Sequence, residues 1–279
     1  MPLDLDVIGR PQQTPPVSWE SRDPIIYALG VGAGYADPCD ELEYTTEQGI
    51  GGSQRVLPTY VSLFGAKVPE IGPFDRTALL HAGQGVQIVR PLPVRGTLNR
   101  TMTVTAIHDL GNGALVCSQT RLEAPSGVLY GLATSEFFIR GEGGFGGERP
   151  QREPDDRPQR EPDAVLRLAT APSQALLYRL SGDLNPIHAD PAVAGAAGFD
   201  RPILHGLCTF GLAGRALLRE FVGDGERLES LRGRFTSPVW PGETLRVDVW
   251  RDGRRAWFRV SRDGGVVVFD RGVAAKGPA

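Results

Sequence analysis

Apolar and polar residues alternate with a period of two along several short stretches, and these stretches recur in both halves of the chain. Period-two alternation that is interrupted by glycine, asparagine and proline turns is typical of antiparallel hairpins. The pattern predicts strands near residues 97–108, 114–123 and 128–140 in the first half, and near 243–251, 254–262 and 266–274 in the second.

One long stretch follows a helical period instead. The segment "HGLCTFGLAGRALLREFV" (205–222) places five large apolar residues and two glycines, Gly211 and Gly214, on one face. A glycine costs about 1 kcal/mol in a helix interior, so we expect a flat neighbour to approach closely, as a sheet wrapped around the helix would. The first half has only a shorter counterpart, "VLPTYVSLFGA" (56–66). The pattern therefore predicts an α+β chain in which a sheet cradles a helix twice, with the first helix shortened.

A segment rich in glycine, proline and charge separates the two halves. It contains RPQREPD twice, at Arg149–Asp155 and Arg157–Asp163. Such composition is typical of an extended, solvated linker. We therefore divide the chain into an N-terminal unit (1–140), a linker (141–163) and a C-terminal unit (164–279).

The halves also share their internal spacing. Pro91 and Pro238 are related by the same offset as Thr97 and Thr244, and each pair precedes a predicted hairpin. This indicates two copies of one unit whose sequences have diverged.

Composition narrows the choice of partner and compartment. The 279 residues, 41% of them hydrophobic, suffice for about two domains with a core. Thirty basic and 33 acidic residues give a net charge of −3, which argues against nucleic acid as a partner. The first residues lack the features of a signal peptide, and no apolar run is long enough to predict a membrane span. Cys39, Cys117 and Cys208 are too scattered for a disulfide framework or a zinc motif, so we expect a cytoplasmic protein without a metal.

Polar groups cluster in one short stretch, "YRLSGDLNPIHADP" (178–191). It follows a predicted short helix with Ser173 as N-cap and an apolar side that includes Leu176 and Leu180. Gly182 is placed to end that helix, and Pro186 prevents an immediate restart. A tight loop should therefore present the polar residues Asp183, Asn185 and His188, and the next helix should begin at Asp190 and Pro191.

Two interpretations of this loop stand on spacing alone. Asp183 and Asn185 could cap their own turns, with His188 as a packed core residue. Alternatively, a carboxylate and an imidazole could converge on one water molecule. Histidine suits proton transfer near neutral pH because its ordinary pKa is about 6.5.

The order Ser-Gly-Asp-x-Asn-Pro-x-His, followed by "GFDRPILHGLCTFG", resembles the hydratase 2 motif of MaoC-like dehydratases, which are (R)-specific 2-enoyl-CoA hydratases of the hot-dog superfamily. In the first half, "LLHAGQGVQIVRPLPVRGTL" resembles the N-terminal unit of the double hot-dog members. The resemblance implies a double hot-dog fold, in which two antiparallel sheets are each wrapped around a helix. It also implies a non-catalytic N-terminal unit that shapes the acyl pocket.

The resemblance also assigns roles by position. Asp183 and His188 match the catalytic pair, Asn185 a supporting residue, and Gly206 the glycine whose backbone N–H acts as oxyanion donor. A glycine at a helix start offers a free N–H, close access and a dipole that favours negative charge. The implied reaction is hydration of a trans-2-enoyl-CoA or the reverse dehydration. Coenzyme A is then part of the substrate and no separate cofactor is expected.

Several points stay open at this stage. The carrier could be an acyl carrier protein, or the chain could bind acyl thioesters without catalysis. The sequence leaves undecided which member of the pair is the base, which acyl chain is preferred, and whether the chain is a monomer or a homodimer. His81 and His205 are expected to have structural roles, His205 through a hydrogen bond to the loop. The coenzyme A phosphates could meet arginines such as Arg55, Arg90 or Arg95.

Overall fold

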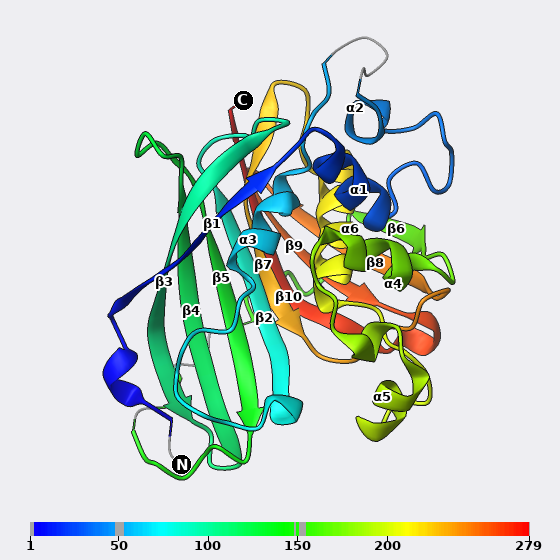
Figure 1. Cartoon of the computed structure of the whole chain (residues 1–279). Coiled ribbons are helices and arrows are strands. Elements are labelled where there is room, and N and C mark those ends of the chain that lie inside the picture. The colour runs from blue at the N-terminus through cyan, green and yellow to red at the C-terminus, as the bar shows by residue number, and fades with distance from the viewer. Residues whose placement is uncertain (1–2, 48–52, 148, 151–154, 279) are drawn as a thin grey trace.

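In the computed structural model, residues 3–47, 53–147, 149–150 and 155–278 are described. Each half of the chain folds into antiparallel strands with short helices on one side (Figure 1). The N-terminal unit contains β1 (Pro11–Trp19), α1 (Arg22–Gly30), α2 (Leu42–Thr45), α3 (Ser62–Gly65), β2 (Leu79–Ile88), β3 (Gly96–Asp109), β4 (Gly113–Glu123) and β5 (Leu129–Arg140). The C-terminal unit contains β6 (Ala164–Ala169), α4 (Gln174–Tyr178), α5 (Pro191–Ala196), α6 (Gly206–Glu220), β7 (Glu226–Phe235), β8 (Thr244–Asp252), β9 (Arg255–Ser261) and β10 (Val267–Pro278).

The two sheets meet edge to edge through β2 and β7. Within the described residues they form one ten-stranded sheet in the order β1-β3-β4-β5-β2-β7-β10-β9-β8-β6. The antiparallel junction runs from Gly83 opposite Arg234 to Gln87 opposite Ser230, and it includes the pair of buried residues Val86 and Leu231. The predicted α+β architecture of two sheet-and-helix units is confirmed, and the units share a continuous backbone ladder.

Helix α6 packs against strands β6, β7, β8 and β10 of the C-terminal sheet, with Leu207, Phe210 and Leu217 buried as their spacing predicts. The shortened first helix is also confirmed, since a 3₁₀ turn (Pro58–Val61) and the single-turn α3 stand in its place. None of the helices in the described part of the chain is both long and apolar enough to cross a membrane.

The glycine face of α6 has a neighbour that we did not expect. A Cβ at Gly211 would lie 2.5 Å from the Val31 side chain, and a Cβ at Gly214 would strike the Thr59 methyl group. Both neighbours belong to the N-terminal unit, just after α1 and within the Pro58–Val61 turn. The expectation that the glycines admit a flat sheet is therefore wrong at Gly211, where residues of the N-terminal unit fill the notch. At Gly214 the sheet does approach, since a Cβ would lie 3.4 Å from Leu231 of β7, beside Thr59.

Helix α4 also differs from its prediction. The Ser173 side chain makes no capping hydrogen bond, and Leu176 and Leu180 are 55% and 61% exposed. The buried side of α4 instead carries Tyr178 and Gln174, whose amide donates to the carbonyl of Gly30 at 2.6 Å. The helix turns this face inward because it docks on the end of α1, where carbonyl groups need donors.

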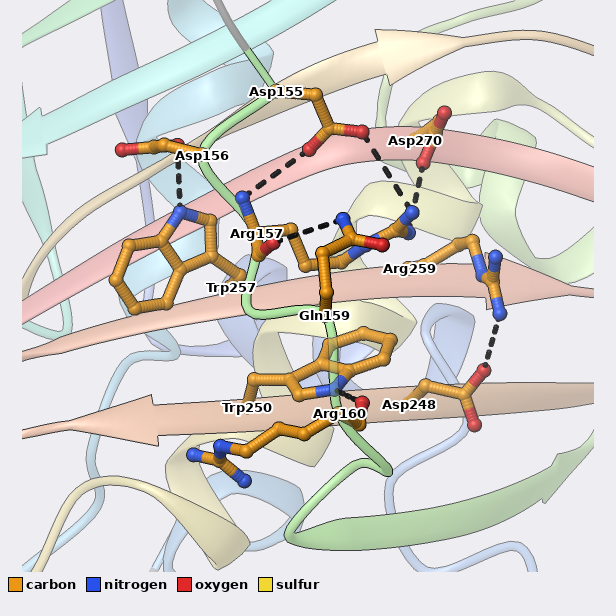
Figure 2. Close-up of polar contacts among 10 residues, drawn as sticks. All are labelled: Asp155, Asp156, Arg157, Gln159, Arg160, Asp248, Trp250, Trp257, Arg259 and Asp270. Atoms are coloured by element: carbon orange, nitrogen blue, oxygen red, sulfur yellow. Dashed lines mark hydrogen bonds and ion pairs between the residues drawn. The ribbon is translucent and has the colours of Figure 1, made fainter.

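The linker boundaries coincide with the end of β5 and the start of β6, but its last part is not free in solvent. Residues 155–163 pack on the outer face of the C-terminal sheet (Figure 2). The Trp250 indole donates to the Arg160 carbonyl at 2.7 Å, and the Trp257 indole donates to Asp156 at 2.8 Å. The Arg157 guanidinium lies 5.1 Å from the Trp250 ring. Residues 148 and 151–154, which include part of the first RPQREPD repeat, lie outside the described residues.

Candidate active site

The loop after α4 forms as its glycine and proline predict. The helix continues into a 3₁₀ turn (Arg179–Ser181), and Gly182 ends it with a φ of +117°, a conformation that favours glycine. A second 3₁₀ turn, Pro186–His188, then carries the histidine. We refer to residues 183–188 as the 183–188 loop.

The polar side chains of this loop stabilise its own backbone. Asp183 Oδ1 accepts from the Asn185 N–H at 3.1 Å, and Asn185 Oδ1 accepts from the Ile187 N–H at 3.2 Å. The Asx turns of the first interpretation are therefore present. They do not exclude the second interpretation, because Asp183 remains exposed and its other carboxylate oxygen is not used in these turns.

His188 is buried and held by the backbone. Its Nδ1 lies 2.8 Å from the carbonyl oxygen of Ile203, which can only accept, so Nδ1 carries the proton and Nε2 a lone pair. Burial lowers the pKa of His188, against opposing contributions from this hydrogen bond and from the charge of Asp183. The ring is therefore a neutral base near pH 7.

His205 connects the 183–188 loop to the head of α6. Its Nε2 donates to the backbone carbonyl of Asp183 at 3.2 Å, which is the hydrogen bond that the sequence predicts. Its ring stacks on His188 with centroids 3.7 Å apart and planes at 26°. Burial, followed by the neighbouring His188, lowers the pKa of His205 to about 4. Two neutral imidazoles thus lie side by side.

Gly206 is the first residue of α6, so its N–H has no acceptor within the helix. The positive end of the helix dipole lies at the same place. A Cβ on this residue would lie 3.1 Å from the Phe235 ring. A larger residue here would push the Phe235 ring back by a few tenths of an ångström, so this contact favours glycine in addition to any need for ligand access.

The N-terminal unit reaches the site through His81 on β2. The His81 ring centroid is 5.0 Å from that of Phe235, and its Nε2 lies 3.1 Å from Gln84 Oε1. Burial lowers the pKa of His81 to about 4, while the charge of Asp183 acts in the opposite direction. His81 therefore lies behind the Phe235 ring that covers Gly206. The hydratase motif did not reveal this placement, because His81 belongs to the N-terminal unit and the motif belongs to the C-terminal unit.

The arginines suggested for the coenzyme A phosphates stay a prediction. Arg90 follows the end of β2 that is opposite to His81, roughly 25 Å away by the rise of a strand. Arg55 lies over the ring of Tyr44, 5.5 Å from its centroid. Arg179 is nearer, since its charge contributes to the lowered pKa of His205.

The same cluster offers a set of metal ligands. One ligand atom each from Asp183, His188 and His205 lies within 4.8 Å of the others. The donors, two imidazoles and a carboxylate, suit a divalent transition-metal ion. The expectation of no metal in this protein therefore stays a prediction.

Comparison with known proteins shows what each half of the chain is similar to. Residues 17–141 match the model of the MFE-2 hydratase 2 N-terminal domain, and residues 153–269 match that of the MaoC like domain. The chain is 44% identical to 3-hydroxyacyl-thioester dehydratase Y of Mycobacterium tuberculosis, covering 93% of this chain and 91% of the relative. It is 41% identical to enoyl-CoA hydratase ChsH3 of the same organism, covering 96% and 97%.

Solved structures show the same fold. A MaoC-like dehydratase from Phytophthora capsici superimposes with a TM-score of 0.87 at 32% identity, covering 99% of this chain and 98% of that one. A Mycobacterium tuberculosis protein described as a double hotdog fold matches with a TM-score of 0.61 at 16% identity, covering 98% of each chain, and supports the fold alone. One assignment follows from the strand order, from the hydratase motif on its loop and from relatives that cover nearly the whole chain. The chain belongs to the MaoC-like, hydratase 2 family of double hot-dog proteins.

Proposed function

We propose that this chain is a hydro-lyase that adds water to a trans-2-enoyl-CoA to give the (R)-3-hydroxyacyl-CoA, and that it catalyses the reverse dehydration. One observation carries the proposal: the 183–188 loop, with Asp183 and His188, is docked against the residues that lead into Gly206. An acid–base pair and an oxyanion donor thus adjoin one another. The relatives named above are hydratases and dehydratases of acyl thioesters.

The proton positions on His188 and Asp183 favour a simple order of reaction steps. The neutral His188 presents a lone pair on Nε2, and Asp183 presents an unused carboxylate oxygen, so the pair can hold a water molecule by accepting its protons. As the water oxygen bonds to C3, one of the two groups takes a proton. The pair then delivers a proton to C2, so that the elements of one water are added and the pair is restored.

The charge that develops during this addition lies on the thioester oxygen. The Gly206 N–H and the positive end of α6 would stabilise it, and loss of one such donor costs about 10²–10³-fold in rate in other enzymes. Asn185 supports the reaction indirectly, because its side chain holds the turn that presents His188.

The proposal is tested with a short enoyl-CoA, followed by loss of the conjugated enoyl thioester, and by chiral analysis of the product. Asp183→Asn and His188→Gln should each reduce kcat by about 10²–10⁴-fold, the range for removal of a general acid or base. Asp190→Asn is the matched control, since Asp190 only caps α5 by accepting from the Ala192 N–H. Near wild-type hydration by both loop variants would contradict the catalytic assignment and favour a non-catalytic acyl-thioester-binding protein.

The second candidate function differs from the first in the carrier of the acyl chain. A 3-hydroxyacyl-ACP dehydratase would use the same pair on a different carrier, so one enoyl chain should be compared on coenzyme A and on acyl carrier protein. We expect the higher kcat/KM with coenzyme A. A preference for the carrier protein would move the chain to lipid or polyketide synthesis.

We further propose that the reaction needs neither a cofactor nor a metal, since coenzyme A is part of the substrate. Hydration should then survive prolonged treatment with a chelator such as EDTA, measured against an untreated sample. A loss of activity that Zn²⁺ restores would instead assign a metal to Asp183, His188 and His205.

We also propose a cytoplasmic location, which the unpaired cysteines favour. The proposed assembly is a monomer or a homodimer of this chain.

A further inference from the structure

Among the residues that the structure describes, the 183–188 loop has few hydrogen bonds to other segments apart from those of two histidines. Asp183, Leu184 and Asn185 are exposed, and the side-chain hydrogen bonds of Asp183 and Asn185 stay within the loop. Two hydrogen bonds connect this loop to residues 203–206, and they run in opposite directions. His188 in the loop donates to the carbonyl of Ile203, and His205 donates back to the carbonyl of Asp183.

His205 is held firmly at its own end. It is the N-cap residue of α6, and its carbonyl accepts from the N–H groups of Cys208 and Thr209. Its ring is 1% exposed and lies between the rings of His188 and Tyr178, 3.7 Å and 4.8 Å away by centroid. The peptide group after His205 carries the Gly206 N–H. The side chain that holds Asp183 and the oxyanion donor are therefore neighbours on one rigid piece of backbone.

The second ring nitrogen of His205 indicates what the residue is for. Nδ1 is buried and has no hydrogen-bond partner among the described residues. An unpaired buried polar atom costs free energy, and a phenylalanine or leucine would fill the same space without that cost. The useful part of the side chain is therefore the Nε2–H donor that points at the Asp183 carbonyl.

We propose that His205 is a positioning residue that fixes the catalytic pair of the 183–188 loop relative to the Gly206 oxyanion donor. This inference rests on the proposed hydration reaction for its effect on rate, but not for its effect on the loop. A misplacement of about 1 Å can cost on the order of 10²-fold in rate, because the reacting groups must be aligned in the transition state. Substrate binding elsewhere in the pocket does not depend on this alignment.

The test separates the donor from the ring. His205→Phe keeps a stacked ring and removes the donor, whereas His205→Gln keeps an N–H donor and removes the ring. We expect kcat to fall about 10²-fold in His205→Phe with KM changed less than about threefold, and His205→Gln to recover at least tenfold of that loss. His108→Gln, on β3 outside the site, is the control for a histidine substitution.

A second measurement does not require turnover. Hydrogen exchange should become several-fold faster at the amides of Asn185, Ile187 and His188 in His205→Phe, and should stay close to wild type in His205→Gln. If His205→Phe does not fold, His205→Met removes the donor with a side chain that adapts to the space.

The outcomes are distinct. Wild-type kcat and exchange in His205→Phe would overturn the positioning role. Equal losses in His205→Phe and His205→Gln would overturn the donor as its cause. A wild-type chain that hydrates no enoyl-CoA would refute the proposed function instead, and the exchange measurement would still decide whether His205 holds the loop.

Discussion

Single side chains in this protein serve the backbone and the proposed chemistry at the same time. Asp183 and Asn185 close the turns that present His188, so the loop would keep its shape only with these residue types. Gly206 is favoured for two reasons, because it leaves its N–H open to a ligand and because a Cβ would press on the Phe235 ring beside it. Neutral histidines complete the picture, because His81, His188 and His205 all have lowered pKa values from burial.

These histidines make stability depend on pH. Their pKa values are lower in the folded chain than in the unfolded chain, so between about pH 6.5 and 4 the unfolded state binds more protons and stability is lost as pH falls. We expect a lower Tm at pH 5 than at pH 7.5, and a smaller difference in His205→Gln. An unchanged difference in this variant would show that the neutral His205 is not a source of the pH dependence.

Helices in this fold are positioned by contacts with segments distant in sequence more than by capping interactions at their own ends. The best example is the segment before α2, where Glu41 adopts a left-handed φ of +59° and pairs with Arg215 in the middle of α6. Arg215 is buried and also donates to the Val31 carbonyl at 2.7 Å. One arginine therefore joins the chain between α1 and α2 to the central helix.

Removal of one partner should be costly. Glu41→Ala leaves a buried guanidinium without its carboxylate, which destabilises proteins by about 3–5 kcal/mol. Asp40→Ala is the matched control, because the neighbouring pair Asp40–Arg219 is about half exposed and its loss should cost about 1 kcal/mol or less. Denaturant unfolding of both variants checks this, and equal effects would show that burial of the Glu41 pair contributes nothing special.

The whole molecule depends on contacts between its two units. The units share the β2–β7 ladder, and the notches of α6 are filled by Val31 and Thr59 from the N-terminal unit. Gln174 of the C-terminal unit in turn satisfies a carbonyl at the end of α1. Where the two units meet, each unit fills gaps or satisfies polar groups on the surface of the other.

Gly211→Ala tests this dependence. Its methyl group would overlap Val31, and overpacking of this kind costs about 1–3 kcal/mol. Val31→Ala should relieve part of that cost in the double variant, as measured by thermal unfolding. Gly195→Ala, in α5, is the control, because a Cβ there meets nothing within 4 Å. A stabilising effect at Gly211, as helix propensity alone predicts, would contradict the proposed contact.

Local patterns predicted six of the ten described strands, the long helix and the 183–188 loop, because period, turn residues and a motif act over a few neighbours. They did not predict β1, β2, β6 and β7, two of which join the units. Gly182, Pro186 and Asp190 each do what their chemistry predicts. The burial of Gln174, the filling of the Gly211 notch and the approach of His81 to Phe235 could not be predicted, since each joins residues far apart in the chain. The docked part of the linker was missed for the same reason, because its tryptophan partners lie on β8 and β9.

The junction of β2 with β7 leaves β1 and β6 as the outer strands of the described sheet. Unpaired edges invite strand addition and aggregation, and proline or brevity protects them. β1 carries Pro15 and Pro16 at an irregular point of its pairing with β3, whereas β6 has no proline. We therefore expect strand addition by a second copy of the chain to be disfavoured at the β1 edge, because proline cannot donate to a backbone ladder.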